Sequence, residues 1–305
     1  MEMIPELQTD IKVFPAFSDI TLETKPLFDE LLGLNPPQGS EYTFTNLFIW
    51  RHLYGFRACR MDNALCIRGT DRAGIEFFMI IAKDTEAYLQ AVGRLAAAVR
   101  KDGTSLKLFR VEERYLDALK QAVPSLVYED DRDNADYVYL ASDLIGLRGR
   151  KYDGKRNHIR KFKANYVSAY ADISEALVDD CIHLAETWYH SKQDPSLEPD
   201  LVATREALTH LTGLGLKGSA ILVDGTVRAF SLAEQLNPDT AVIHIEKYDP
   251  AYEGIPQVIN QQLCEHICGS YRYINREQDL GNEGLRRSKM SYNPVLILNK
   301  YRVCL

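Results

Sequence analysis

The sequence predicts a protein of the α+β class, built from two copies of one unit in which strands and helices follow in the same order. The 305 residues are enough for two domains of ordinary size. Each half reads as strand, two helices, hairpin, strand, helix, strand, helix and strand. Each half also has a hairpin turn, at Asp62-Asn63 and at Asp224-Gly225. The repeat lies in this pattern and not in residue identity at a fixed period.

The elements of the first half follow from hydrophobic periodicity, helix caps and glycine or proline stops. Asp84 or Thr85 begins the strongest amphipathic helix, and Gly103 follows its end. The predicted set is a strand over 11–17, helices over 21–34 and 43–55, a hairpin over 56–69, a strand over 75–82, a helix over 84–103, a strand over 105–111, a helix over 112–122 and a strand over 134–142.

The second half repeats this order, and Pro256 and Gly269 mark the start and the end of one of its helices. The predicted set is a strand over 166–174, helices over 175–192 and 200–215, a hairpin over 218–236, a strand over 240–248, a helix over 256–269, a strand over 271–277, a helix over 282–292 and a strand over 294–303. We place the domain boundary after residue 146, so that the domains are 1–146 and 147–305.

The composition is that of a soluble globular protein, with 46% hydrophobic and 26% charged residues and a net charge of -7. No apolar run approaches the ~20 residues that a membrane helix needs. The N-terminus lacks the pattern of a secretory signal, so we expect a cytoplasmic protein without an integral membrane segment. None of the six cysteines forms a C-x-x-C pair. Buried thiols are therefore expected at Cys264 and Cys268, beside His266, and no metal site.

A basic segment crosses the domain boundary. Arg148–Lys163 has eight Lys or Arg and one Asp, a net charge of +7 in an acidic chain. One interpretation is a solvated helix face, which charged runs usually are. The other is a surface that binds phosphates of a cofactor, an RNA or a lipid headgroup. The candidate anion-binding residues here are Lys151, Lys155, Arg156 and Arg160.

The strand over 240–248 has an unusual polar face. Alternation predicts Val242, His244, Glu246 and Tyr248 on one side. If this side lines a cleft, Glu246 or His244 could act as a general base. The alternative is a solvated face, or one that pairs with helix charges. The helix that follows begins near Ile255, and the free backbone donors of such a start attract phosphate.

The stretch over 275–292 is densely charged. Alternation in the preceding strand places Asn275 and Glu277 on one face. A tight turn follows, and then a helix that contains Arg286, Arg287 and Lys289. These cations either contact a ligand phosphate or join an ion network that holds the turn. The sequence leaves both alternatives open.

The order strand, glycine-containing turn, helix, strand, helix and strand resembles the core of the GNAT acyltransferase superfamily. In that fold the helix start after the fourth strand holds the pyrophosphate of coenzyme A. The resemblance implies two tandem GNAT-like domains, each a mixed, mostly antiparallel sheet flanked by helices. It also implies coenzyme A or acyl-CoA contacts at Tyr248, Tyr252, Glu253, Gly254, Ile255, Pro256, Gln257 and Asn275.

A second resemblance covers almost the whole chain. The stretches "YTFTNLFIWRHLYG", "KRNHIRKFKANY", "IHIEKYDPAYEG" and "YINREQDLGNEGLRRSKMSYNP" look like the family related to the C-terminal domain of bacterial phosphatidylglycerol lysyltransferases. Those domains resemble two tandem GNAT units, as do the Fem-type enzymes that use aminoacyl-tRNA. A lipid acceptor is not implied, because the lipid-modifying enzymes carry a large membrane domain.

The resemblances imply acyl or aminoacyl transfer to an amine or hydroxyl of an unknown acceptor. The second domain would bind the donor, and the first would be a degenerate copy that supports it. We expect Glu246 to act as the base, with His244 and Glu277 as alternatives, and Tyr292 to protonate the leaving group. Acyl-CoA is the favoured donor and aminoacyl-tRNA the alternative. A binding module of the same fold without catalysis is a third hypothesis.

Overall fold

The computed structural model describes residues 11–101 and 103–305, which form two compact units. The first unit contains the chain up to Pro37, Glu41–Asp131 and Lys300–Leu305, and the second contains Gln38–Ser40 and Arg132–Asn299. The predicted boundary after residue 146 therefore differs from this division. Residues 132–146 belong to the second unit, and the last six residues return to the first.

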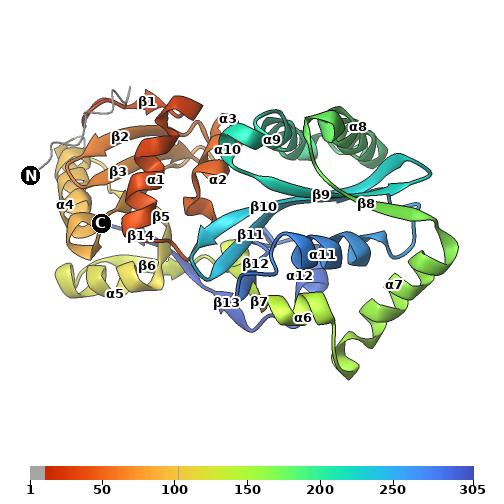
Figure 1. Ribbon diagram of the computed structural model, residues 1–305. Coiled ribbons are helices and arrows are strands. Elements are labelled where there is room, and N and C mark those ends of the chain that lie inside the picture. The colour runs from red at the N-terminus through yellow and green to blue at the C-terminus, as the bar shows by residue number, and fades with distance from the viewer. Residues whose placement is uncertain (1–10, 102) are drawn as a thin grey trace, which may run out of the picture. The chain divides into compact units, whose positions relative to one another are not determined.

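The first unit is a seven-stranded sheet with the order β1-β2-β3-β4-β5-β14-β6 (Figure 1). Its strands are Ser18–Asp19, Arg57–Met61, Ala64–Thr70, Glu76–Ala82, Lys107–Glu112, Val127–Asp130 and, as β14, Lys300–Cys304. Its helices are α1 (Lys25–Leu34), α2 (Phe44–Ile49), α3 (Arg51–Tyr54), α4 (Thr85–Lys101) and α5 (Glu113–Ala122). The predicted strand over 11–17 is reduced to a single bridge between Val13 and Arg60. The short strand β6 lies outside every predicted element.

The second unit is also a seven-stranded sheet, with the order β13-β7-β12-β11-β10-β9-β8. Its strands are β7 (Asp136–Leu140), β8 (Ser168–Asp172), β9 (Lys217–Val223), β10 (Thr226–Asn237), β11 (Thr240–Tyr248), β12 (Tyr273–Asn275) and β13 (Leu296–Leu298). Its helices are α6 (Ala141–Gly146), α7 (Asp153–Asn165), α8 (Glu175–Lys192), α9 (Glu198–Thr209), α10 (Leu211–Leu214), α11 (Ile255–His266) and α12 (Glu283–Met290).

The predicted repeat is present, with one addition. The strands of the first sheet correspond in order to those of the second, and a parallel pair in each sheet, β4 with β5 and β11 with β12, occupies the same place. Each sheet also receives a strand from the other half of the sequence. β7 lies between β12 and β13, and β14 lies between β5 and β6. The strand predicted over 294–303 is therefore divided at Asn299 between two sheets.

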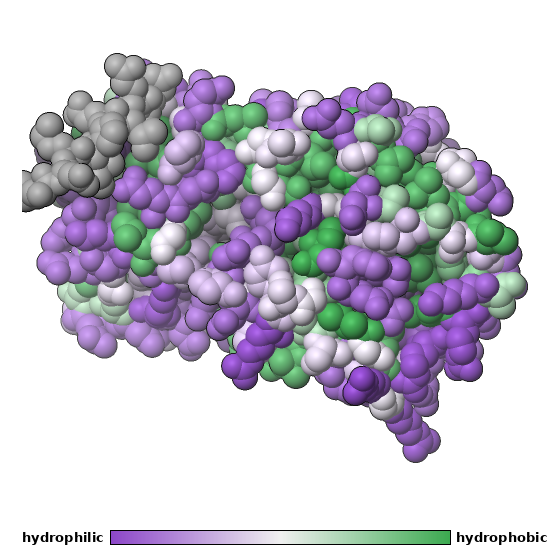
Figure 2. Space-filling model, in the orientation of Figure 1, coloured by the Kyte–Doolittle hydropathy of each residue, from purple (hydrophilic) through white to green (hydrophobic). Residues whose placement is uncertain are grey.

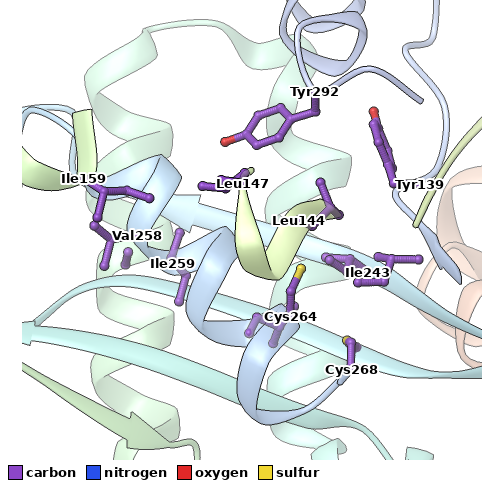
Figure 3. Close-up of a cluster of buried hydrophobic side chains, with 14 of the residues drawn as sticks. Tyr139, Leu144, Leu147, Ile159, Ile243, Val258, Ile259, Cys264, Cys268 and Tyr292 are labelled. Carbon is purple, nitrogen blue, oxygen red and sulfur yellow. The ribbon is translucent and has the colours of Figure 1, made fainter. Parts of the chain in front are cut away.

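The core of the second unit lies between its sheet and α6, α7 and α11. Ile243 of β11, Leu144 of α6 and Cys264 of α11 are buried in it together with Tyr139 and Tyr292 (Figure 3). Helices α8 and α9 cover the opposite face of this sheet (Figure 1). Lys247 of β11 points to that side, because it forms an ion pair with Asp200 of α9.

A β-bulge in β11 changes the predicted alternation. Leu232 of β10 pairs with Ile245 and the next residue, Ala233, pairs with Ile243, so His244 is the extra residue. Beyond the bulge, Glu246 and Tyr248 point to the α11 side, on which Ile243 also lies. The prediction that Val242, His244, Glu246 and Tyr248 share one face, opposite Ile243 and Ile245, is therefore wrong. A bulge of this kind re-aims side chains next to a site.

Candidate functional site

The centre of the site is an ion pair between Glu246 of β11 and Arg276, which directly follows β12. Arg276 Nη2 lies 3.3 Å from Glu246 Oε1, and Asn260 of α11 donates a hydrogen bond of 3.2 Å to Glu246 Oε2. The Glu246 side chain is 18% exposed and that of Arg276 is 12% exposed. The carboxylate therefore reaches the surface while two side chains hold it in place. Glu246 was predicted, whereas Arg276 and Asn260 were not.

The local backbone explains why the strand pattern missed Arg276. β12 ends at Asn275, whose amide nitrogen donates to Asp136 at 2.8 Å and whose amide oxygen accepts from the backbone N–H of Glu277 at 2.8 Å. Glu277 has a φ of 54°, in the left-handed region, so the alternation predicted over 271–277 stops there. Asn275, predicted to contact a cofactor, instead uses its side chain to hold this turn.

The two strands diverge at this place. β11 and β12 pair only from Thr240 to Val242, although β11 continues to Tyr248. The Glu246–Arg276 ion pair spans the gap between the two strands beyond Val242, which we call the wedge. Tyr248 lies two residues further along the same strand, and burial together with the Glu246 charge raises the pKa of its hydroxyl.

Asn260 has an unsatisfied acceptor beside this carboxylate. The residue is 1% exposed, and its Oδ1 atom has no hydrogen-bond partner within residues 11–101 and 103–305. A buried amide oxygen without a partner costs about 1–3 kcal/mol, so natural proteins rarely keep one without a use. The sequence did contain a signal, because Asn260 interrupts a buried helical stripe of Val258, Ile259, Leu263 and Cys264.

Tyr292 and Lys155 complete the site. Tyr292 is buried, and desolvation raises the pKa of its hydroxyl although the nearby Arg276 opposes this. Lys155 of α7 donates to Ser291 Oγ at 2.7 Å, and its Nζ lies 3.9 Å from the centre of the Tyr292 ring. Figure 3 shows Tyr292 beside Tyr139, above the apolar cluster. The structure thus brings together four residues that the sequence predicted in four different roles. They are Glu246, Tyr248, Tyr292 and Lys155.

His244 and Glu277 form a separate cluster. His244 is buried, with Nδ1 2.7 Å from Glu277 Oε1 and Nε2 2.8 Å from Glu234 Oε1. Burial alone would lower the imidazole pKa, but hydrogen bonds to the two carboxylates outweigh it and raise the pKa to about 10. The imidazole is therefore protonated at neutral pH. This geometry does not favour His244 as a base. Instead, its two hydrogen bonds connect β11 to β10 and to the residue after the end of β12, a contact that we call the His244 brace.

The start of α11 does not offer the donors that the sequence predicted. The backbone N–H groups of Gln257 and Val258 both bond to the carbonyl of Gly254, at 3.1 and 3.2 Å, and Ile255 N–H bonds to Tyr252. Gly254 has a φ of 89°, and a Cβ there would lie 2.3 Å from the carbonyl oxygen of His158 in α7. Helix α7 therefore packs directly against this helix start.

The side chains near this helix start are also engaged with the chain itself. Tyr252 packs on Tyr166, with ring centres 5.0 Å apart, and exposed Glu253 pairs with Lys161 at 3.0 Å. Pro256 occupies the first turn. In the first unit, the corresponding start of α4 is capped by Asp84, whose Oδ1 accepts from Ala87 N–H at 2.8 Å. A carboxylate there excludes phosphate.

The basic segment covers an exposed face, which includes the hydrophilic surface at the lower right of Figure 2. Lys151 pairs with Asp143 at 3.1 Å, and Arg156 binds Asp153 and the carbonyls of Leu147 and Gly149. Four exposed cations have no ion pair with any residue that the structure describes. They are Arg148, Arg150, Arg160 and Lys163. Lys151 and Arg156 are therefore engaged with the chain itself, whereas phosphate binding by the segment stays a prediction.

The charged turn after β12 is mainly an ion network. Arg286 binds Asp279 with two hydrogen bonds of 2.8 Å and Asp133 with one of 2.9 Å, while Tyr137 and Arg132 also donate to Asp279. These donors overcome burial and hold the pKa of Asp279 well below its usual range. Of the predicted anion-binding residues in this segment, Arg286 is therefore already engaged.

The other two predicted cations of the turn differ from each other. Arg287 is 75% exposed and pairs with Glu283 at 3.4 Å. Lys289 is buried and donates to the backbone carbonyl of Arg276, and its own burial together with the Arg276 charge lowers its pKa to about 8. Lys289 therefore supports the strand end that presents Arg276, rather than facing solvent.

Across the described ranges 11–101 and 103–305, no cluster of three or more His, Cys, Asp or Glu could hold a metal ion. Cys264 and Cys268 are buried thiols, whose pKa values burial raises, and His266 stacks on Tyr170 with ring centres 4.0 Å apart. Within the same ranges, no helix is both long and apolar enough to span a membrane.

Comparison with known proteins identifies relatives over most of the chain. Residues 33–304 match the family described as phosphatidylglycerol lysyltransferase, C-terminal. A conserved protein of unknown function from Bacteroides thetaiotaomicron has 32% sequence identity and a TM-score of 0.86, with 95% of this chain and 99% of that chain covered.

Two further solved structures are similar in fold at low identity. The C-terminal domain of a putative lysylphosphatidylglycerol synthetase from Agrobacterium fabrum has 13% identity and a TM-score of 0.66 over 93% of this chain and 92% of its own. FemX has 9% identity and a TM-score of 0.61 over 94% of this chain and 96% of its own. The predicted α+β fold with two mixed sheets flanked by helices is confirmed.

The buried His244 predicts a pH dependence of stability. Its pKa in the folded protein, about 10, lies above the ordinary 6.5, so its contribution is complete below pH 6.5 and falls as the pH rises toward 10. Between pH 6.5 and 8, we expect the free energy of unfolding of the wild type to fall relative to that of the His244→Gln variant. The difference should change by at most ~1.4 kcal/mol per pH unit. Lys155 and Lys289, whose pKa values are about 8, also begin to titrate in this window, but they do so in both proteins, so the comparison with His244→Gln isolates the imidazole.

Urea denaturation at several pH values in this window provides the measurement. His190→Gln, at an exposed histidine of the same unit, is the control and should retain the slope of the wild type. Equal slopes for wild type and His244→Gln would show that the imidazole is not held protonated.

Proposed function

This chain belongs to the phosphatidylglycerol lysyltransferase C-terminal family, and we propose that it is a transferase that moves an acyl or aminoacyl group from an activated ester to an amine or hydroxyl. The observation that carries the proposal is the wedge between β11 and β12. There Glu246, Arg276, Asn260, Tyr292 and Lys155 converge, and a buried amide oxygen has no partner among the residues that the structure describes.

Glu246 is the proposed general base. Its carboxylate reaches solvent, and its two oxygens, which offer about four acceptor sites, are only partly used by Arg276 and Asn260. It could therefore accept the proton of an acceptor amine or hydroxyl as that group attacks the ester carbonyl. Arg276 lies beside it and would stabilise the negative oxygen that develops.

Tyr292 is the proposed acid for the leaving group. Its hydroxyl is kept protonated by burial, and Lys155 lies over its ring. A tyrosine with a raised pKa holds its proton at neutral pH and can release it to an alkoxide, which is a far stronger base. In each turnover, Glu246 would thus take up one proton from the acceptor, and Tyr292 would give one proton to the leaving group.

The geometry favours a donor other than acyl-CoA. In the predicted pyrophosphate turn, the N–H groups of Gln257 and Val258 bond to the Gly254 carbonyl, and Gly254 is packed against His158 of α7. The residues present there do not fit a pyrophosphate, so we derive no step from coenzyme A. The four cations of Arg148–Lys163 without an ion pair in the described part of the chain instead suit a longer polyanion. Aminoacyl-tRNA is such a donor, since it joins a phosphate backbone to an aminoacyl ester.

The class of the acceptor nucleophile is not defined. The first unit is proposed to support the second. In the first unit, Tyr88 of α4 stacks on Tyr115 of α5 with ring centres 3.9 Å apart, and Arg114 binds Glu112 at 2.7 Å, so these side chains are engaged with one another. The family relationship names a lipid-modifying enzyme, and a lipid headgroup is one acceptor to include in assays.

Replacing Glu246 by Gln tests the catalytic assignment. The amide keeps the shape of the side chain but cannot accept the proton, so turnover should fall about 10²-fold or more. The assay is single-turnover transfer from a panel of aminoacyl-tRNAs and acyl-CoAs to a panel of amines and lipids. The matched control is Glu253→Gln, an exposed carboxylate of the same unit, which should retain activity.

Full activity of Glu246→Gln would contradict its role as the base. Tight binding of a donor by the wild type, with no transfer to any acceptor, would instead support a binding module without catalysis.

The choice of donor predicts a salt dependence. Arg160→Gln with Lys163→Gln should weaken binding of aminoacyl-tRNA and reduce the slope of log affinity against log salt by about 0.7–0.9 for each phosphate that is no longer neutralised. Arg287→Gln, an exposed cation outside the segment, is the control. Filter binding between low and physiological salt measures the slopes. An unchanged slope in the double variant would exclude this face as the tRNA surface.

A further inference from the structure

We propose that Lys155 is a self-acylation site, whose amine takes acyl groups from activated carboxyl compounds such as acyl phosphates, active esters and acid anhydrides. The inference goes beyond the proposed function, because it concerns a covalent modification of this chain and needs neither the natural donor nor its acceptor.

The contacts of Lys155 leave its nitrogen free to react. The side chain is half-buried at the edge of the wedge, and Nζ donates to Ser291 Oγ at 2.7 Å. The Ser291 hydroxyl donates its own proton to the carbonyl of Ser288 at 2.6 Å, so it only accepts from Lys155. A neutral Lys155 amine can keep this hydrogen bond through one N–H while its lone pair stays available for attack.

Neighbouring lysines of the same segment are in a different situation. Lys151 pairs with Asp143 at 3.1 Å and Lys161 pairs with Glu253 at 3.0 Å. Each carboxylate stabilises the ammonium form, which has no lone pair. Lys155 has no carboxylate within ion-pair distance in the described part of the chain, and the Tyr292 ring lies under it at 3.9 Å. Lys163 also has no ion pair in the described ranges, but it is exposed, whereas Lys155 is half-buried against the Tyr292 ring.

The surrounding charges act in the same direction. Burial and the Arg276 guanidinium lower the pKa of Lys155 to about 8, and Glu246 only partly opposes them. The groups that face it are thus Ser291 and Tyr292, after α12, Arg276, after β12, and Glu246 of β11. Since each pKa unit changes the neutral fraction tenfold, about a quarter of Lys155 is a neutral amine at pH 7.5, against ~0.1% of an ordinary lysine.

The reaction is an aminolysis and balances without a further reagent. The Lys155 nitrogen attacks the carbonyl carbon, an N–C bond forms, and the bond from that carbon to the leaving oxygen breaks. The proton lost by nitrogen passes to the leaving group or to water. The products are an amide on Lys155 and a free alcohol, carboxylate or phosphate. The positive charge of Arg276 would stabilise the oxyanion formed on the way.

Competitive labelling of the intact protein tests the inference. Trace isotope-labelled acetic anhydride is added between pH 6 and 10, and the protein is then unfolded and fully acetylated with unlabelled reagent. Mass spectrometry of peptides gives the relative rate for each lysine. We expect Lys155 to react at least about tenfold faster than Lys151 and Lys161 at pH 7.5, with a midpoint near pH 8. Lys155→Arg identifies the labelled peptide.

A second variant separates this inference from the proposed function. Glu246→Gln removes a charge that favours the Lys155 ammonium, so labelling of Lys155 should persist or increase while the proposed transfer is abolished. Acetyl phosphate, at neutral pH, should then acetylate Lys155 before Lys151 and Lys161. Labelling of Lys155 no faster than that of Lys161, or a midpoint above pH 10, would overturn the proposal.

Discussion

The divergence of β12 from β11 is the constraint on which the site depends. The hydrogen bond between Asn275 and Asp136 holds the end of β12 to its own side of the sheet, while β11 continues beyond the last paired residue, Val242. Because the strands separate, Arg276 and Glu246 meet across a gap instead of across a ladder of backbone hydrogen bonds. The bulge at His244 then turns Glu246 toward α11 and Asn260.

The exchange of strands between the halves of the chain stabilises this arrangement. β7 pairs with β12 on one side and with β13 on the other, so the short β12 is not an edge strand. The Asp279 network fixes the turn that follows, and the His244 brace ties the same turn to β10 and β11. These supports on both sides of Arg276 hold its guanidinium in the ion pair with Glu246, in a site where both side chains are largely buried.

Much of the architecture was predictable because it rests on local signals. Periodicity, the Asp224-Gly225 turn and the caps at Asp84 and Pro256 gave the repeat and most elements. The exchange of β7 and β14 was not predictable, since pairing between distant strands has no local signature. The residues of the site were found only in part. A bulge and a left-handed Glu277 each break the alternation from which a strand face is inferred.

The partial prediction of the site has the same cause. Glu246 was found because it belongs to a strand face that reads as unusually polar, whereas Arg276 was not singled out, since alternation pointed to Asn275 and Glu277 instead. The predicted donors of α11 are taken up by the nearby carbonyls of Gly254 and Tyr252, and the packing of α7 on Gly254 is a tertiary contact that has no local signal in the sequence. Conversely, Asn260 could have been predicted from the sequence, because it lies in a buried apolar stripe. A polar side chain there lowers stability unless it has a hydrogen-bond partner or a function.

If the wedge keeps buried polar groups for a ligand, it does so at some cost in stability. Asn260→Leu tests it most directly, since leucine is of similar size and removes the unsatisfied oxygen along with the hydrogen bond to Glu246. Thermal unfolding and donor transfer of this variant should be measured together. We expect an unchanged or higher melting temperature and a transfer rate at least about tenfold lower. A destabilised variant with full transfer activity would contradict it, because Asn260 would then serve the fold alone.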